Sequence, residues 1–119
     1  MAWQAEVTDE FAAWYKSLPE ELQDAIAAKV ELLEQYGPYL RRPHADSLAK
    51  MSKYLNMKEL IVQHGGDAYR IIFAFDPRRV AILLLGDRKP DDRWYKDAVP
   101  LADRLYGEHL RTLREEGLL

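Results

Sequence analysis

Hydrophobic and polar positions alternate along the second half of the chain, which is the pattern of β-strands with one buried face. The alternation runs over residues 59–63 and 69–75, and residues 80–85 are apolar on both faces, as in a central strand. Gly65-Gly66-Asp67 is typical of a tight hairpin, and Asp76-Pro77-Arg78-Arg79 turns the chain before the third segment. The pattern predicts an antiparallel meander of three strands.

The first third of the chain combines one short strand with helical periodicity. Residues 3–7 alternate between apolar and polar, and Thr8 is a suitable N-cap for a helix whose apolar positions lie between residues 11 and 18. Ser17-Leu18-Pro19-Glu20 has the form of a capping box for a second helix, which Gly37-Pro38 ends. We therefore expect a strand and a helical hairpin whose apolar stripe packs on the sheet.

Two further segments complete the predicted fold. Residues 38–57 are rich in Pro, Arg, Lys and Ser, which predicts an irregular connection with a short strand near Ala49–Tyr54. After Gly86 a C-terminal amphipathic helix is predicted, with Pro100 in its first turn or at a kink; its apolar stripe consists of Ala102, Leu105, Tyr106, His109, Leu110 and Leu113. The predicted class is α+β, with residues 1–119 forming a single domain.

Composition excludes several classes of function. The chain has no cysteine, which removes disulfides, thiolate zinc sites and cysteine nucleophiles, and its three histidines are scattered, so neither a metal nor a cofactor is expected. No apolar run approaches the roughly 20 residues that span a bilayer, and the first residues lack the features of a secretory signal. We expect a cytoplasmic protein that does not act at a membrane.

Charge is unevenly distributed along the chain. The net charge of −3 argues weakly against a protein that binds nucleic acid. Residues 37–96, however, carry twelve basic and seven acidic side chains, net +5, between residues 1–36 at net −6 and residues 97–119 at net −2. A basic centre of this kind can focus a positive field on one face. The alternative, that the charges only solvate exposed faces, stays open at this point.

The segment Tyr54–Tyr95 and the residues after it resemble a known family. KEL in one predicted strand, YRIIFAFD in the next, then LLLGDRK, WY and PLADRLYGEHL are similar to the phage-derived HigB-like branch of the RelE/ParE superfamily of type II toxin–antitoxin toxins. The resemblance covers nearly the whole chain. It implies an α/β toxin that an antitoxin, often a helix-turn-helix protein, neutralises. RelE- and HigB-like members cut mRNA in the ribosomal A site without a metal, whereas ParE-like members poison DNA gyrase.

Metal-free RNA cleavage sets the chemistry that the site residues must supply. The reaction activates the 2′-hydroxyl against the adjacent phosphate, so it needs a proton acceptor, cations that stabilise the developing charge and a donor for the leaving 5′-oxygen. The resemblance implies that Lys, Arg and Tyr do this work. Arg70, in the Tyr-Arg pair of the second predicted strand, is the first catalytic candidate, because a guanidinium binds phosphate through two parallel hydrogen bonds. The alternative is an ion pair with Glu59 across the hairpin.

Three further catalytic candidates follow the meander. Arg88 and Lys89 match the GDRK segment, where relatives keep a basic residue that stabilises the transition state or protonates the leaving group; the alternative is an exposed basic turn. Tyr95 is near the position of the C-terminal tyrosine of RelE-like enzymes, as a catalytic or base-stacking residue. Trp94 beside it is a candidate for stacking on an RNA base. Core packing is the alternative for both aromatic residues.

Other basic residues are candidates for RNA binding. Lys58 lies near the sheet edge where relatives place basic residues that face the RNA. Arg41, Arg42 and His44 form a loop cluster that suits the phosphates of ribosomal RNA. Arg79 is a weaker candidate, for which a turn ion pair with Asp76 is the favoured interpretation. The remaining histidines, at positions 64 and 109, are expected to be structural.

One position departs from the family pattern. In relatives the strand that begins Lys-Glu-Leu generally continues with arginine, but this chain has Ile61 there. If that arginine is catalytic, its loss costs about a hundredfold or more in rate. Three functions remain open: a ribosome-dependent mRNA endonuclease that inhibits translation, a ParE-like gyrase inhibitor, and a catalytically weak relative that mainly binds its antitoxin.

Overall fold

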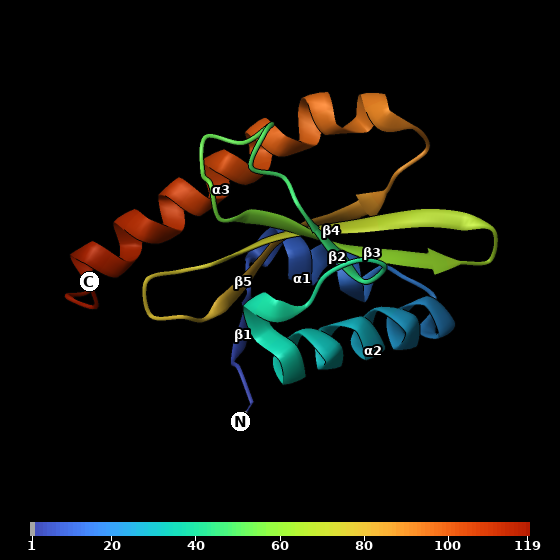
Figure 1. Cartoon of the computed structure of the whole chain (residues 1–119), viewed down its shortest axis with the longest axis horizontal. Helices are drawn as coiled ribbons and strands as arrows, with labels where there is room; N and C mark the ends of the chain where they lie inside the picture. Colours follow the sequence, from blue (N-terminus) through green and yellow to red (C-terminus); the bar gives the residue numbers. More distant parts are fainter. Residues whose placement is uncertain (1) are drawn as a thin grey trace.

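A five-stranded sheet with the order β1-β5-β4-β3-β2 forms the centre of the computed structural model, which describes residues 2–119 (Figure 1). β3 (Met57–His64), β4 (Asp67–Phe75) and β5 (Ala81–Arg88) are an antiparallel meander, as predicted. β1 (Ala5–Val7) runs parallel to β5, and β2 (Ala45–Ser47) runs antiparallel to β3. The N-terminal strand is therefore one edge of the same sheet and not a separate element.

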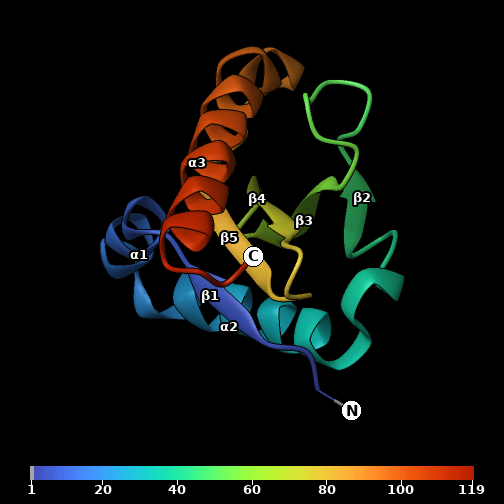
Figure 2. The ribbon, with the colours of Figure 1, turned by 90° about the vertical axis from the view of Figure 1, so that its left-hand side faces the viewer.

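Helices cover both faces of the sheet (Figure 2). α1 (Asp9–Lys16) and α2 (Glu20–Tyr36) pack on one face, and α3 (Tyr95–Glu115) packs on the other. Short 3-10 turns follow α2 (η1, Gly37–Tyr39) and precede α3 (η2, Asp92–Trp94). Among residues 2–119, no helix is long and apolar enough to cross a lipid bilayer. The predicted α+β class, with its helical hairpin and C-terminal helix, is confirmed.

Alternation along the strands sorts side chains between the two faces. Leu60 and Ile71 belong to the core under α1 and α2, whereas Ile72 belongs to the core under α3. A register shift between Ile72 and Phe73 of β4 interrupts the pairing with β5. Beyond this bulge, Arg70 pairs with Asp87 and Tyr69 pairs with Arg88. The side chains at the end of β5 therefore point to the opposite face from the one that an unbroken strand would give them.

The connection before β3 differs from its prediction. The short strand is Ala45–Ser47, and residues 49–54 form turns. The buried carboxylate of Asp103 on α3 organises these turns, because it accepts hydrogen bonds from the Ser52 hydroxyl and, at 3.0 Å, from the Lys53 backbone N–H. The turns thus bind to α3 through side-chain oxygens, whereas a strand would need a partner in the sheet.

Helix ends agree with the sequence at Thr8 and at Gly37, which is the C-cap of α2, and disagree at the predicted capping box. The Thr8 hydroxyl accepts a hydrogen bond from the Phe11 N–H at 3.0 Å, which confirms the predicted N-cap of α1. The predicted capping box is wrong, because Ser17 ends α1 by donating to the Trp14 carbonyl at 2.6 Å, and Pro19 is the N-cap of α2 without a side-chain hydrogen bond. Pro100 lies inside α3, beyond the first turn.

Candidate active site

A cavity of about 600 Å³ opens on the α3 face of the sheet, where the ends of β4 and β5 meet the start of α3 and the loop that carries β2. Acidic, basic and aromatic side chains share it. Four of them, Arg42, Arg70, Lys89 and Tyr95, are residues that the sequence had singled out. The lining as a whole consists of Arg42, Pro43, Asp46, Ser47, Leu48, Met51, Glu59, Ile61, Arg70, Lys89, Asp92 and Tyr95.

Glu59 lies at the centre of this pocket and is 5% exposed. Its carboxylate accepts a bifurcated hydrogen bond from the Tyr95 hydroxyl, whose oxygen lies 2.8 Å from Oε1 and 3.0 Å from Oε2. The Nε atom of Arg70 lies 3.2 Å from Glu59 Oε1, close enough for an ion pair but not aligned as a hydrogen bond. The Arg70–Glu59 pair that the sequence offered as an alternative is therefore present, and it is part of the pocket.

Lys89 brings a second cation beside Tyr95. Its side chain is only 13% exposed, its Nζ atom is 2.8 Å from the carboxylate of Asp92, and it lies 5.1 Å from the centre of the Tyr95 ring. The backbone N–H of Lys89 donates to the Ala68 carbonyl at 2.8 Å, which continues the pairing of β5 with β4 past Arg88. The backbone thus positions the ammonium group, and the aromatic ring stabilises it there.

Burial changes the acid–base properties of the two central groups. Burial raises the pKa of Glu59, although the hydrogen bond from Tyr95 and the charge of Arg70 oppose that shift. Burial, followed by the neighbouring Glu59 carboxylate, raises the pKa of Tyr95 to about 12. At neutral pH Tyr95 therefore remains a hydrogen-bond donor, and burial increases the affinity of the Glu59 carboxylate for a proton. A carboxylate in this state suits a general base.

Each cation of the pocket is next to a carboxylate. Arg42 contacts Asp46 Oδ2 through Nε at 2.9 Å and Nη2 at 2.7 Å, and the hydrogen bond from Arg42 lowers the pKa of Asp46. The Arg70–Glu59 and Lys89–Asp92 pairs are the other two. An anionic ligand that enters the pocket must compete with these carboxylates for the cations. Within residues 2–119, no group of three or more His, Asp or Glu side chains is arranged to hold a metal ion.

Two of the predicted basic residues lie on the other face of the sheet. Arg88 is 56% exposed, forms an ion pair of 3.5 Å with Asp67 and lines a separate cavity beside Trp14 and Tyr69. The β4–β5 bulge explains this position, since unbroken alternation would have placed Arg88 on the face of Arg70. Lys58 also lies on that face, where its Nζ donates to the carbonyl of Pro38 in η1, the turn after α2, at 3.1 Å.

Three other candidates do not line the pocket. Trp94 packs edge-on against Tyr95 at 5.3 Å, and its indole N–H donates to Asp87 Oδ2 at 3.2 Å. His44 is bound through Nδ1 to Lys29 Nζ at 2.8 Å, on the side of α2. Arg41 is exposed in the loop before β2. Of the basic loop cluster, only Arg42 belongs to the cavity.

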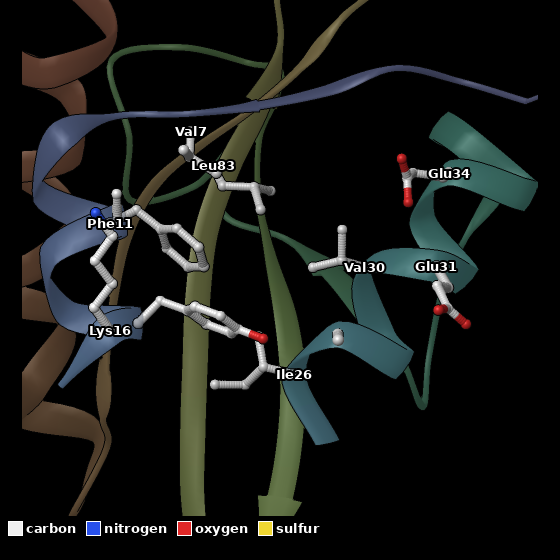
Figure 3. A pocket seen from close by; sticks show the side chains of 11 residues that line it. Val7, Phe11, Lys16, Ile26, Val30, Glu31, Glu34 and Leu83 are labelled. Atoms are coloured by element: carbon white, nitrogen blue, oxygen red, sulfur yellow. The ribbon is translucent and has the colours of Figure 1, made fainter. Parts of the chain in front are cut away.

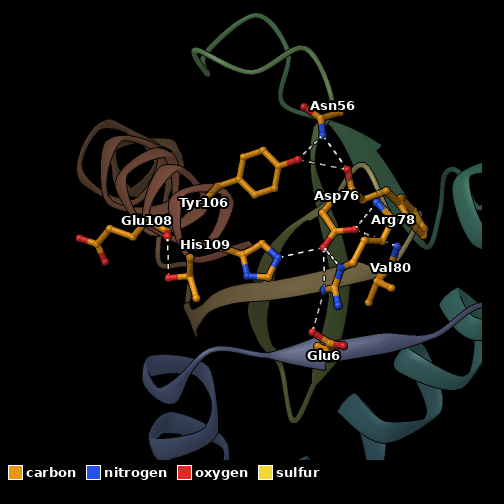
Figure 4. A network of polar contacts seen from close by, with 10 residues as sticks. Glu6, Asn56, Asp76, Arg78, Val80, Tyr106, Glu108 and His109 are labelled. Atoms are coloured by element: carbon orange, nitrogen blue, oxygen red, sulfur yellow. Dashed lines mark hydrogen bonds and ion pairs between the residues drawn. The ribbon is translucent and has the colours of Figure 1, made fainter. Parts of the chain in front are cut away.

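Arg79 lies in the β4–β5 turn, at the far end of β4 from the pocket. Its guanidinium stacks over the Trp3 ring at 4.9 Å. The predicted ion pair with Asp76 is wrong, because Asp76 instead contacts Arg78 at 2.8 Å and His109 at 2.9 Å (Figure 4). This polar network joins β1, the β4–β5 turn and α3, and it confirms a structural role for His109.

Glu59 was not predicted as a member of the site. From the sequence, this residue was expected only as an ion-pair partner of Arg70. The available signal was the face that Glu59 shares with buried Met57, since a carboxylate on an apolar face needs a partner or a function. The sequence did not indicate Asp46 or Asp92 as members of the site, because both follow polar stretches that are typical of exposed loops.

Comparison with solved structures supports the fold. The chain is similar to a chain of the archaeal RelE–RelB complex of Pyrococcus horikoshii OT3, with a TM-score of 0.56 and 17% identity over 76% of this chain and 98% of that one. It is also similar to a chain of the RelBE2 toxin–antitoxin complex of Mycobacterium tuberculosis, with a TM-score of 0.53 and 13% identity over 75% and 100% of the two chains. The isolated RelE toxin of E. coli matches with a TM-score of 0.52 and 10% identity, over 83% and 97%. At these identities the likeness shows the fold alone.

Sequence comparison shows the family. The chain is 37% identical over 118 residues to the candidate toxin HigB2 of Mycobacterium tuberculosis, covering 97% of this chain and 58% of the relative. It is 42% identical over 93 residues to the candidate toxin HigB3 of the same organism, covering 76% and 79%. The chain thus spans little more than half the length of HigB2. The model of the family "Phage derived protein Gp49-like (DUF891)" matches residues 13–107. The chain therefore belongs to the Gp49-like family and is related to the toxins HigB2 and HigB3, and its fold is similar to that of RelE.

Proposed function

We propose that this chain is the toxin of a toxin–antitoxin system and that it cleaves mRNA on the ribosome without a metal ion. The observation that carries the proposal is one pocket that holds a buried carboxylate, Glu59, together with Arg70, Lys89 and Tyr95. These side chains include a proton acceptor, cations and proton donors, which are the groups that transesterification of RNA requires.

Glu59 is the proton acceptor in this scheme. It removes the proton of the ribose 2′-hydroxyl, whose oxygen then attacks the adjacent phosphorus atom. The bond from phosphorus to the 5′-oxygen breaks, and the products are a 2′,3′-cyclic phosphate and a 5′-hydroxyl. Burial favours proton uptake by Glu59, and the hydrogen bonds from Tyr95 hold the carboxylate in one orientation.

Arg70 and Lys89 stabilise the phosphate as its negative charge increases. A phosphate that approaches Arg70 competes with Glu59 for the guanidinium, and this exchange releases the carboxylate for proton transfer. Lys89 supplies the proton that the leaving 5′-oxygen takes up. Tyr95 keeps its own proton, because its pKa is raised to about 12, and acts by orienting Glu59. Arg88 has no part in this scheme, since it lies on the opposite face.

The partners of this function are an antitoxin, the ribosome and mRNA, all in the cytoplasm. Two structural neighbours come from a RelE–RelB complex and from the toxin–antitoxin complex RelBE2, which supports the expectation of an antitoxin. Arg42 lines the pocket, Trp94 packs against Tyr95, and Arg41 is exposed next to Arg42 in the chain, so these three residues are the candidates to contact RNA outside the cleavage site.

A second candidate function is a catalytically weak toxin relative that mainly binds its antitoxin. Ile61 favours it, because this side chain lines the pocket opposite Arg70 on β4, where relatives generally carry an arginine. The carboxylates that pair with the cations of the pocket also reduce the affinity of the pocket for phosphate. Nothing in the pocket specifically favours a gyrase inhibitor.

Primer extension on an mRNA that is being translated tests the proposal. The wild-type chain should produce defined cleavage sites, and Arg70→Ala should not. Arg93→Ala is the matched control, because Arg93 is exposed, pairs only with Asp91 and lies outside the pocket. Intact message together with normal growth on expression would contradict the proposal. Intact message with inhibited supercoiling would instead indicate a gyrase inhibitor.

A further inference from the structure

A second cavity, the α3 cavity, adjoins the candidate active site at the start of α3 and has a volume of about 360 Å³, which is in the range of small-molecule sites. Its lining consists of Met51, Asp92, Tyr95, Lys96, Val99 and Pro100. The first three of these residues also line the active-site pocket. The apolar cavity between α1 and α2 (Figure 3), by contrast, shares no lining residue with that pocket within residues 2–119. A substrate held in the active site can therefore extend into the α3 cavity.

Apolar surfaces from two segments of the chain line the α3 cavity. Met51 belongs to the turns before β3, whereas Val99 and Pro100 belong to α3. Met51 and Pro100 are exposed, so a ligand here covers apolar surface that otherwise faces water. Proteins bind single-stranded RNA by packing side chains against the flat faces of unstacked bases and by hydrogen bonding to the edges of those bases. The α3 cavity offers apolar side chains for the flat face of one base.

Asp92 is the acidic group of the α3 cavity, and it lines the active-site pocket as well. Its side chain is 89% exposed, and its Oδ1 atom lies 2.8 Å from the Nζ atom of Lys89. A carboxylate has about four lone-pair sites, so Asp92 can hold the ammonium group and still accept two hydrogen bonds from a ligand. Asp92 therefore connects Lys89, in the active-site pocket, with the α3 cavity.

We infer that the α3 cavity binds the base of the nucleotide that follows the cleaved bond, and that Asp92 selects guanine there. The inference rests on the proposed function and names the base that this function requires. In that function Lys89 gives its proton to the leaving 5′-oxygen. The nucleotide that carries this oxygen therefore lies next to the Lys89–Asp92 pair, and its base is the one that reaches the α3 cavity.

The hydrogen-bonding edges of the four bases explain the choice of guanine. Guanine carries two adjacent donors on its Watson–Crick edge, the ring N–H and the amino group, which match the two oxygens of a carboxylate. Adenine and cytosine each carry one amino donor beside a ring nitrogen that accepts, and uracil carries one N–H between two carbonyl acceptors. An acceptor that faces a carboxylate oxygen stays unpaired. A well-formed pair of hydrogen bonds discriminates against the wrong base by about tenfold or more.

Holding Lys89 is the alternative role for Asp92. A residue that only holds the ammonium group would change binding and cleavage by the same factor for every base. A residue that contacts the base changes the order of preference among bases. Asp92→Asn keeps the size of the side chain but presents one acceptor and one donor, which match the edges of adenine and cytosine. The variant should therefore no longer prefer guanine.

Binding of 5′-mononucleotides tests the inference without RNA cleavage. Each of them carries a phosphate on the 5′-oxygen, as the leaving nucleotide does before the bond breaks. NMR titration of the wild-type chain should give a Kd for 5′-GMP about tenfold lower than for 5′-AMP, 5′-CMP and 5′-UMP. Asp92→Asn should bind 5′-AMP or 5′-CMP better than 5′-GMP. Asp97→Asn is the matched control, because Asp97 is an exposed carboxylate in the first turn of α3 that lines neither cavity, and it should keep the preference for 5′-GMP.

The apolar side of the α3 cavity has its own test. Met51→Ala should weaken the binding of all four mononucleotides several-fold without changing their order, because it removes a contact with the flat face of the base. Leu55→Ala is the matched control, since Leu55 is exposed on the same connection before β3 and lines neither cavity. It should bind all four as the wild type does. Equal effects of the two substitutions would contradict a base in this cavity.

Primer extension on translated message separates the inference from the proposed function. The wild-type chain should cut mainly before guanine, and Asp92→Asn should cut before other bases. Unsaturable binding of 5′-GMP, equal affinities for the four mononucleotides, or an unchanged preference for guanine in Asp92→Asn would each overturn the inference, even if the message is cut. A preference for 5′-GMP that Asp92→Asn removes, with the message left intact by the wild type, would support the α3 cavity and contradict the proposed cleavage.

Discussion

Substitution of Glu59 by glutamine separates RNA binding from RNA cleavage. In the wild type, the Tyr95 hydroxyl lies 2.8 Å and 3.0 Å from the two carboxylate oxygens of Glu59. Glutamine keeps the size of the side chain and one oxygen that accepts a hydrogen bond from Tyr95. It removes the group that accepts the proton of the 2′-hydroxyl. A positioned general base contributes about 10²–10⁴-fold in rate, so we expect the cleavage rate to fall by that factor, about 2.7–5.4 kcal/mol in activation free energy.

RNA affinity should not fall in the same variant. The carboxylate lies 3.2 Å from Arg70, and its negative charge opposes an entering phosphate. Single-turnover cleavage and fluorescence anisotropy with the same RNA measure the two effects separately. Glu108→Gln is the matched control, because it alters an exposed Glu–Arg pair on α3. Cleavage within about tenfold of the wild type, or parallel losses of binding and cleavage, would refute the role of Glu59 as base.

The stability of Glu59→Gln gives an independent check with a defined sign. The pKa of Glu59 is higher in the folded chain than in the unfolded one, so the folded state takes up the proton more readily. Protonated Glu59 therefore stabilises the folded chain. This contribution to the free energy of unfolding is fully present below the ordinary glutamate pKa, and it is lost as the pH rises through the higher pKa that Glu59 has in the folded chain. Denaturant titrations should show that the wild type loses stability relative to Glu59→Gln over this window.

Three other predictions concern the same pocket. Tyr95→Phe removes the hydrogen bond that lowers the pKa of Glu59, so the acidic limb of the pH–rate profile should move to higher pH; an unshifted limb would mean that Glu59 is not the titrating group. Lys89→Ala should lower cleavage by about 10²–10³-fold, whereas Arg88→Ala, on the opposite face, should change it little; equal losses would contradict the assignment of Lys89. Ile61→Arg adds a cation to the pocket and should tighten RNA binding and increase growth inhibition on expression, whereas an unchanged toxicity would show that this position is not limiting.

Periodicity along the chain predicted the secondary structure well where one face is buried. The meander, the helical hairpin and the C-terminal helix each have a clear apolar stripe, which burial in a core explains. The prediction failed where side chains form hydrogen bonds with backbone groups. Ser17 caps the end of α1 instead of the start of α2, and Asp103 binds the turns that were predicted as a strand. Both contacts depend on where distant or competing groups lie in space.

The candidate site was predictable in part for the same reason. Arg70, Lys89 and Tyr95 were found through the family resemblance, and the structure brings them into one pocket. Arg88 was grouped with Lys89, although consecutive side chains of a strand point to opposite faces, and no sequence pattern reveals the β4–β5 bulge that decides which of the two faces the pocket. Glu59 was taken only as the partner of Arg70, because its bonds to Tyr95 join residues 36 positions apart.

Chemical analysis of the RNA ends tests the central claim most directly. Transesterification with Glu59 as base and Lys89 as acid leaves a 2′,3′-cyclic phosphate on one fragment and a 5′-hydroxyl on the other. We predict these two ends on mRNA cleaved during translation by the wild-type chain, and their absence with Glu59→Gln. Fragments that carry a 5′-phosphate, or message that stays intact while the chain arrests growth, would contradict it.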